Sequence, residues 1–257
     1  MQKVLEIVLN EVGYLEKSSN NDLDSKTANA GSANYTKYGR DMHNIQPTNM
    51  DFPASWCDAF VDWCFMKAYG VDTAKQLLCG NFDDYTVTSA GLYKQSGRWF
   101  NNPERGDQVF FKNNERICHT GLVVDVKGGF IFTVEGNTSS GGEIVPNGGA
   151  VCAKKYPLNH PRIAGYGRPK YNLVKDSQES SNTENIKFYE VLGWNKDNIG
   201  WWYAWGYNKG EYHVNNAVRI NGKLYFFDTA GYCVRGDLKI KTDENGALIS
   251  IAGERFS

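Results

Sequence analysis

The sequence lacks several features that would place it in a common functional class. No apolar run approaches the roughly 20 residues that a membrane-spanning helix needs, and the mean hydropathy is -0.52. The 28 Lys and Arg residues are balanced by 29 Asp and Glu residues, so there is no basic surplus for nucleic acid. CxxC and HExxH motifs are absent and histidines number only four. We therefore expect no metal, no cofactor, no nucleic-acid partner and no membrane insertion.

The first residues also lack the basic region, apolar stretch and small-residue cleavage site of a secretory signal. They indicate instead an amphipathic helix over about residues 3–17, whose apolar stripe runs from Val4 to Leu15. This start predicts a protein made in a reducing cytoplasm, with its six cysteines as free thiols.

Aromatic side chains are abundant, at 14% of the residues, and are densest after a polar segment at 175–185 (KDSQESSNTEN) that predicts a linker. The residues before this segment predict helices at 3–17, 56–69 and 72–79, and strands at 107–112, 120–126, 130–135 and 150–156. Beyond it, the sequence repeats with a period of 22 residues: Gly200-Trp201-Trp202-Tyr203 is followed by the similar Gly222-Lys223-Leu224-Tyr225. A repeat of this length predicts stacked β-hairpins. We predict an α+β domain at 1–171, a linker at 172–186 and a β-hairpin repeat module at 187–257.

One candidate nucleophile begins a predicted helix. The run SWCDAFVDWCF places Cys57 in the first helical turn, where free amides and the helix dipole favour a thiolate. The alternative is that Cys57 is a small core residue like Cys64.

A predicted hairpin supplies partners for such a thiolate. A three-residue loop at 127–129 would pair Val126 with Phe130, and this register places His119 and Glu135 on one side of the sheet together with Asn137. A cysteine nucleophile needs a histidine to take its proton and a further polar group to orient the imidazole.

Three motifs in order, WCDAFV, HTGLVV and VEGNTS, resemble the CHAP family of cysteine, histidine-dependent amidohydrolases/peptidases. The segments EVGYLEK, GDQVFF and RIAGYGRPKY are similar to phage endolysins of Gram-positive hosts. The resemblance covers about residues 1–171 and implies a papain-like fold. It implies that Cys57 is the nucleophile, His119 the general base, and Glu135 and Asn137 the orienting groups.

The resemblance also implies a reaction on peptidoglycan. The thiolate would attack an amide carbonyl and form a thioester, which water then hydrolyses. The predicted activity is that of an N-acetylmuramoyl-L-alanine amidase, which cuts the amide between N-acetylmuramic acid and L-alanine. The alternative is cleavage of a peptide bond of the stem or cross-bridge. Some CHAP enzymes carry an acidic calcium-binding loop before the cysteine. Here the only acidic residues at 41–56 are Asp41 and Asp51, too few for such a site. We predict that Asp41 lies in a solvated turn and that Asp51 is a cap.

The aromatic repeats GWWYAWGYNKGEY and INGKLYFFDTAGY resemble choline-binding-type cell-wall repeats over about residues 187–236. The resemblance implies stacking of rings on quaternary ammonium groups or sugars, although Ala217 and Leu224 depart from the pattern. The candidate wall-binding residues are Trp194, Trp201, Trp202, Tyr203, Tyr225 and Phe226. The alternative is that these rings form only the core of the module.

Together these features predict an endolysin kept in the host cytoplasm until its release onto the cell wall. Its partners would be peptidoglycan and a wall-linked carbohydrate or choline-like ligand of Gram-positive bacteria. Two alternatives belong to other classes, namely a catalytically inactive wall-binding protein and a cysteine isopeptidase or transglutaminase acting on proteins.

Overall fold

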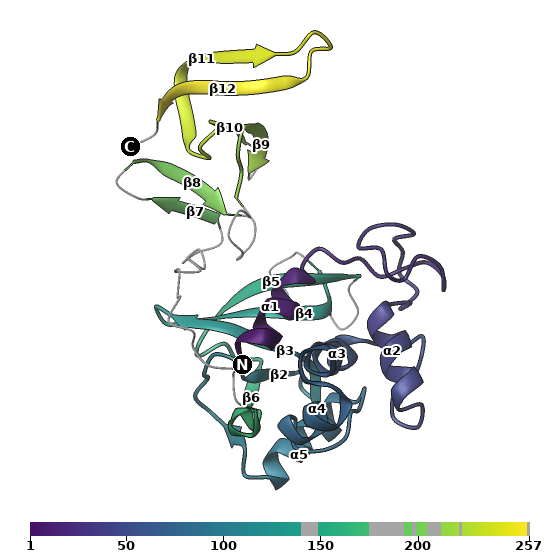
Figure 1. The fold of residues 1–257 in the computed structure, drawn as a ribbon. Coiled ribbons are helices and arrows are strands. Elements are labelled where there is room, and N and C mark those ends of the chain that lie inside the picture. Colours follow the sequence, from purple (N-terminus) through teal and green to yellow (C-terminus); the bar gives the residue numbers. More distant parts are fainter. Residues whose placement is uncertain (140–148, 175–192, 197–198, 205–211, 221–222, 256–257) are drawn as a thin grey trace. The chain divides into compact units, whose positions relative to one another are not determined.

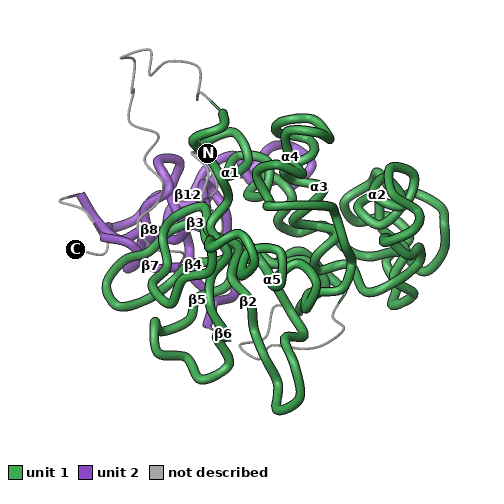
Figure 2. Tube along the Cα trace, turned by 90° about the horizontal axis from the view of Figure 1, so that it is seen from below, with its two compact units in different colours: residues 1–179 green, residues 180–257 purple. Residues whose placement is uncertain are grey.

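The computed structural model describes residues 1–139, 149–174, 193–196, 199–204, 212–220 and 223–255. The chain divides into two compact units, residues 1–179 and 180–257, which Figures 1 and 2 draw and which are described separately below. The predicted linker segment 175–185 and most of the glycine-rich stretch at 139–149 lie outside the described residues.

The first unit is an α+β fold, as predicted. Its helices are α1 (Gln2–Asn10), α2 (Lys37–Ile45), α3 (Cys57–Tyr69), α4 (Val71–Leu77) and α5 (Thr86–Gln95), with a 3-10 turn at Tyr171–Leu173. Its strands are β1 (Trp99–Phe100), β2 (Gln108–Lys112), β3 (Ile117–Lys127), β4 (Phe130–Thr138), β5 (Ala150–Pro157) and β6 (Ile163–Gly167). They form one antiparallel sheet in the order β1-β6-β2-β3-β4-β5.

Helix α3 is the centre of this unit. It packs against β3 and β4 on the sheet and against α1, α2 and α4, which surround it in Figure 1. Its side chains are buried on nearly every face, including those of Asp58 and Asp62. A helix enclosed on so many sides has little freedom to tilt, so its first residue is held at a fixed place beside the sheet.

The N-terminal helix is shorter than predicted. Its buried residues are Val4, Leu5, Val8 and Leu9, as the apolar stripe indicates, but it ends at Asn10. Gly13 then adopts φ +88°, a conformation that favours glycine, and Leu15 forms a β-bridge to Ala150 instead of a further helical turn.

The second unit consists of successive antiparallel hairpins. Strands β7 (Gly193–Lys196) and β8 (Trp201–Ala204) form a two-stranded sheet. Strands β9 (Asn216–Ile220), β10 (Lys223–Phe227), β11 (Cys233–Thr242) and β12 (Leu248–Arg255) form a four-stranded sheet in the order β12-β11-β10-β9. Ile220, Phe227 and Cys233 form the centre of its small core, and Trp194, Trp201, Tyr203, Val218 and Tyr225 pack against them half-buried. No helix within the described ranges has the length and apolarity required to cross a membrane.

Candidate active site and aromatic cavity

Cys57 is the first residue of α3 and is nearly buried, with 5% of its surface exposed. Backbone amides in the first turn of a helix have no partner within the helix, so they are free to stabilise negative charge at the thiol or on a bound oxygen. Cys64, seven residues on, is fully enclosed, and burial raises the pKa of its thiol well above the usual value. The same helix therefore carries one cysteine at its positive end and one inert cysteine in its interior. All six cysteines are free.

The β3–β4 hairpin carries the histidine and the carboxylate. Its loop has two residues, Gly128 and Gly129, both at positive φ, so Lys127 pairs with Phe130 and the predicted three-residue loop is wrong. An irregularity between Val123 and Asp125 shifts the pairing back by one residue.

Beyond this bulge Leu122 pairs with Val134, which is the predicted register. The next residue toward the site, Gly121, lies against Glu135 so closely that any side chain at this position would overlap it. The absence of a Cβ at Gly121 thus leaves room for the Glu135 carboxylate beside the histidine.

His119 and Glu135 form a buried pair. Nε2 of His119 lies 2.9 Å from Oε2 of Glu135, and the two side chains are 1% and 0% exposed. Glu135 accepts two further hydrogen bonds, from the Thr133 hydroxyl at 2.5 Å and from the Tyr156 hydroxyl at 3.2 Å. Three donors therefore fix the carboxylate, which in turn fixes the plane of the imidazole ring.

The pKa of His119 is raised to about 10. Burial alone lowers this pKa, because it disfavours the charged ring, but the interactions of the ring with Cys57 and Glu135 outweigh burial. The structure thus brings three of the predicted site residues, Cys57, His119 and Glu135, into one interacting group. At neutral pH this environment favours the imidazolium form.

Asn137 is also buried at this end of β4. Its φ is +53°, and the pairing of β4 with β5 is irregular between Glu135 and Thr138. Strict alternation of side chains, on which its predicted direction depended, does not hold in such a stretch.

Two residues missed by the sequence reasoning position the start of α3. Trp56, directly before the cysteine, donates from Nε1 to Oε2 of Glu16 at 2.9 Å, and Glu16 accepts a second bond from the Asn34 amide at 3.2 Å. The Trp56 ring stacks on Tyr38 and covers Gly136, where any side chain would overlap it. Because Gly136 follows Glu135, Trp56 links the cysteine helix to the strand of the carboxylate. Glu16 lies in the EVGYLEK segment, but nothing in that segment indicates a partner 40 residues away.

The residue after the cysteine anchors the helix to the sheet. Asp58 accepts hydrogen bonds from the Ser89 hydroxyl at 2.6 Å and from Nε2 of Gln108 at 2.9 Å, and Gln108 also donates to Thr120. Burial raises the pKa of Asp58 to about 7, although these two hydrogen bonds oppose the shift. Asp58 is thus a positioning group that connects α3 to α5 and to two strands.

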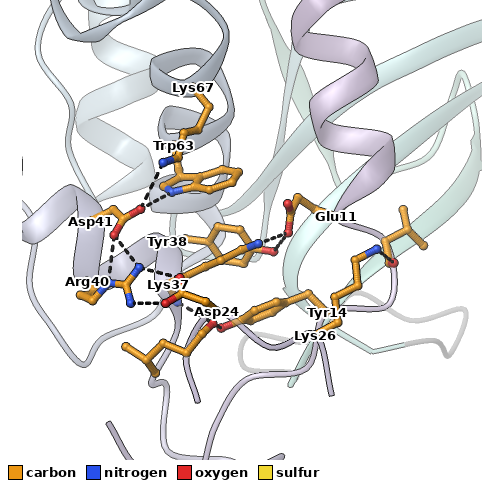
Figure 3. Close-up of polar contacts among 12 residues, drawn as sticks. Glu11, Tyr14, Asp24, Lys26, Lys37, Tyr38, Arg40, Asp41, Trp63 and Lys67 are labelled. Atoms are coloured by element: carbon orange, nitrogen blue, oxygen red, sulfur yellow. Dashed lines mark hydrogen bonds and ion pairs between the residues drawn. The ribbon is translucent and has the colours of Figure 1, made fainter. Parts of the chain in front are cut away.

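Asp41 is not the predicted solvated turn. It lies in α2 and accepts a hydrogen bond from Trp63 Nε1 at 2.8 Å, and it forms ion pairs with Arg40 at 2.8 Å and Lys67 at 3.7 Å (Figure 3). The prediction was wrong because the polar segment around it forms a helix whose contacts with α3 are long-range. Asp51 is exposed, and its backbone amide donates to Asp84. In the described part of the chain no three His, Cys, Asp or Glu side chains converge so as to hold a metal ion.

The second unit contains a cavity of about 690 Å³. Four of the six predicted wall-binding residues line it, namely Trp194, Trp201, Tyr225 and Phe226, together with Leu224, Cys233, Val234, Arg235, Gly236 and Leu238. The other two lie elsewhere. Trp202 contacts Tyr212, and Tyr203 stacks on His213.

Comparison with known proteins finds a likeness to one domain family within the first unit. Residues 48–137 match the family model of the CHAP domain, and this range contains all four predicted catalytic residues. Over these residues the chain is therefore similar to a CHAP domain, the class of cysteine- and histidine-dependent amidohydrolases and peptidases.

The whole chain is similar to one solved structure, described as the crystal structure of Ly7917. The two chains are 13% identical, the match covers 99% of this chain and 95% of the other, and the TM-score is 0.36. So loose a superposition supports no inference about fold or function. No curated protein matches the chain.

Proposed function

We propose that the first unit is an N-acetylmuramoyl-L-alanine amidase that works through a thioester on Cys57. The observation that supports this proposal is the buried group of Cys57, His119 and Glu135, in which the histidine pKa is raised to about 10. A charged imidazolium beside a cysteine at the start of a helix is the arrangement with which cysteine hydrolases stabilise the reactive thiolate.

In the proposed mechanism, the Cys57 thiol gives its proton to His119 and the thiolate attacks the amide carbonyl carbon. The tetrahedral oxyanion is stabilised by the Cys57 backbone amide at the start of α3. The amine then leaves with the proton of His119, and a thioester remains. His119 next takes a proton from water, which attacks the thioester and releases the acid. Glu135 orients the imidazole through both steps, and the assignment of Asn137 as a second orienting group rests on the motif resemblance alone.

The second unit would hold the enzyme on the wall. Support comes from the four predicted wall-binding rings that line one cavity, and from the resemblance of the repeats to cell-wall-binding repeats. The endolysin role, with storage in the host cytoplasm and release onto the wall, rests on the motif resemblance alone and is part of the same proposal.

Mass spectrometry of digested, purified peptidoglycan tests the reaction. We expect new free amino groups on L-alanine and intact glycan strands. Cut stems or cross-bridges would instead identify an endopeptidase and overturn the bond assignment while leaving the thioester mechanism in place. Cleavage of protein amides with no release from peptidoglycan would favour the isopeptidase class.

The matched variants are Cys57→Ala and Cys64→Ala, on the same helix. We expect Cys57→Ala to lose activity by about 10³-fold or more, whereas Cys64→Ala retains it. A Cys57→Ala protein that still released fragments would contradict the mechanism, and wild-type protein without any hydrolysis would favour an inactive wall-binding protein.

A further inference from the structure

The cavity of the second unit has cationic groups beside it and no carboxylate among its described lining residues. Arg235 is part of the lining, and Nζ of Lys196 lies 5.6 Å from the ring centroid of Trp201, another lining residue. A cage for a quaternary ammonium group needs open ring faces and gains from nearby negative charge. The charged groups beside this cavity are instead two cations, of which Arg235 is paired with the exposed carboxylate of Glu254.

The ring faces are also largely occupied within the module. Trp194 contacts Tyr203, Tyr225 and Phe227 at centroid distances of 5.3, 4.8 and 6.0 Å. Lys196 already takes the cation position over Trp201. An added ammonium ligand would have to displace the protein's own ammonium group, and would then meet Arg235.

The Arg235 side chain is open to solvent at the cavity. It forms an ion pair with Glu254 at 3.1 Å, and the two side chains are 51% and 68% exposed. Ion pairs this exposed contribute little, so an anion can replace or share the carboxylate at small cost. A guanidinium carries five N–H donors in a planar fork that suits phosphate oxygens.

The remaining lining is apolar. Leu224, Tyr225 and Leu238 present carbon surface, and a volume of about 690 Å³ accommodates a ligand of one or two sugar rings. The apolar face of a sugar or the carbon chain of a polyol packs on such surface. An attached phosphate would then reach the guanidinium.

We propose that this cavity binds a phosphorylated sugar or polyol, with its carbon face on the apolar lining and its phosphate on Arg235. The proposal rests on the wall-binding role proposed above and specifies its ligand class. Of the two ligands that the sequence suggested, this proposal favours the wall-linked carbohydrate over the choline-like ligand.

The test uses full-length Cys57→Ala protein and isothermal titration calorimetry with N-acetylglucosamine 1-phosphate, glycerol 3-phosphate, free N-acetylglucosamine, inorganic phosphate and choline. We expect the two organic phosphates to bind most tightly. Arg235→Gln should weaken them about tenfold, as expected for the loss of a charge-assisted hydrogen bond. Lys239→Gln, which removes an exposed cation outside the cavity on the same strand, should leave binding unchanged.

A second variant tests the sign of the charge. Leu224 is 47% exposed, so Leu224→Asp should fold and add a carboxylate to the cavity, and Ile240→Asp is its control at an exposed site outside the cavity. We expect Leu224→Asp to weaken the organic phosphates by about tenfold or more. Tighter binding of choline than of organic phosphate, or equal binding of the neutral sugar, would overturn the ligand class.

Sedimentation of the same Cys57→Ala protein with purified walls separates the two proposals. If the protein sediments with the walls and added glycerol 3-phosphate does not reduce the bound fraction, the ligand class alone is overturned. A protein that stays in the supernatant would overturn the wall-binding role.

Discussion

The two units use polar and aromatic groups in opposite ways. In the first unit the reactive and positioning groups are enclosed, with His119, Glu135, Glu16 and Asp58 each at most 1% exposed. In the second unit the cavity rings are half-buried, and its arginine is open to solvent. Bond cleavage requires fixed distances between few atoms, which burial and multiple hydrogen bonds provide. Binding a ligand at the surface, as proposed for the second unit, requires accessible surface, which its half-buried rings retain.

In the enclosed site of the first unit, we expect the largest effect from removing the charge of Glu135. Glu135→Gln keeps an acceptor for His119 but loses the negative charge that raises the His119 pKa, so we expect kcat/KM to fall about 10²- to 10³-fold. The imidazolium is lost as pH rises through the histidine pKa, which is about 10 in the wild type. The alkaline limb of the pH–rate profile should therefore move to lower pH in the variant.

Glu115→Gln is the control for this change, because Glu115 is exposed in the loop before β3. Its profile should match the wild type. If Glu135→Gln kept the wild-type alkaline limb, the carboxylate would not set the histidine pKa.

A smaller effect is expected from the contact between Glu16 and Trp56. Glu16→Ala leaves the buried Trp56 N–H without its acceptor and loosens the start of α3, so we expect kcat to fall about tenfold with KM little changed. Trp56→Phe should give a similar loss, and the double variant should add little to either.

Trp63→Phe is the matched control, since it removes an indole hydrogen bond to Asp41 in the same ring cluster. It should lower Tm without lowering kcat. Equal losses of kcat in Trp63→Phe and Trp56→Phe would reduce the role of Trp56 to general packing.

The smallest expected effect concerns stability and pH at Asp58. Burial raises its pKa to about 7, above the ordinary 3.8, so its contribution to folding is fully present below about pH 4 and is lost as pH rises through 7. Asp58→Asn cannot ionise, and its Tm should therefore fall less between about pH 5 and pH 8 than that of the wild type. Asp72→Asn, at an exposed position of α4, should keep the wild-type slope. If Tm changed with pH equally in Asp58→Asn and in the wild type, the Asp58 carboxyl would not titrate in that range.

Local pattern was sufficient for the elements that carry the reactive groups. The apolar face from Cys57 to Ala68 predicts α3, and alternation predicts β3 and β4. Helices α2 and α5 were missed, because α2 is rich in polar residues and α5 combines β-branched residues with a central glycine. Their helical form depends on packing against the rest of the unit.

Contacts between distant segments could not be read from the sequence. Glu16 with Trp56, Asp58 with Ser89, and Asp41 with Trp63 join residues 22 to 40 positions apart. The hairpin register was predicted correctly at the site although the turn was predicted wrongly, since a bulge compensates for the shorter loop.

That bulge has a practical consequence for labelling the protein. Because the pairing of Leu122 with Val134 is separated from the tip by an irregular step, the register at the catalytic end does not depend on the length of the loop at the tip. We expect the glycine pair at 128–129 to accept an inserted peptide tag or a fluorophore-bearing cysteine without moving His119 relative to Glu135. The labelled protein could then be followed in the sedimentation test with purified walls while its site keeps its geometry.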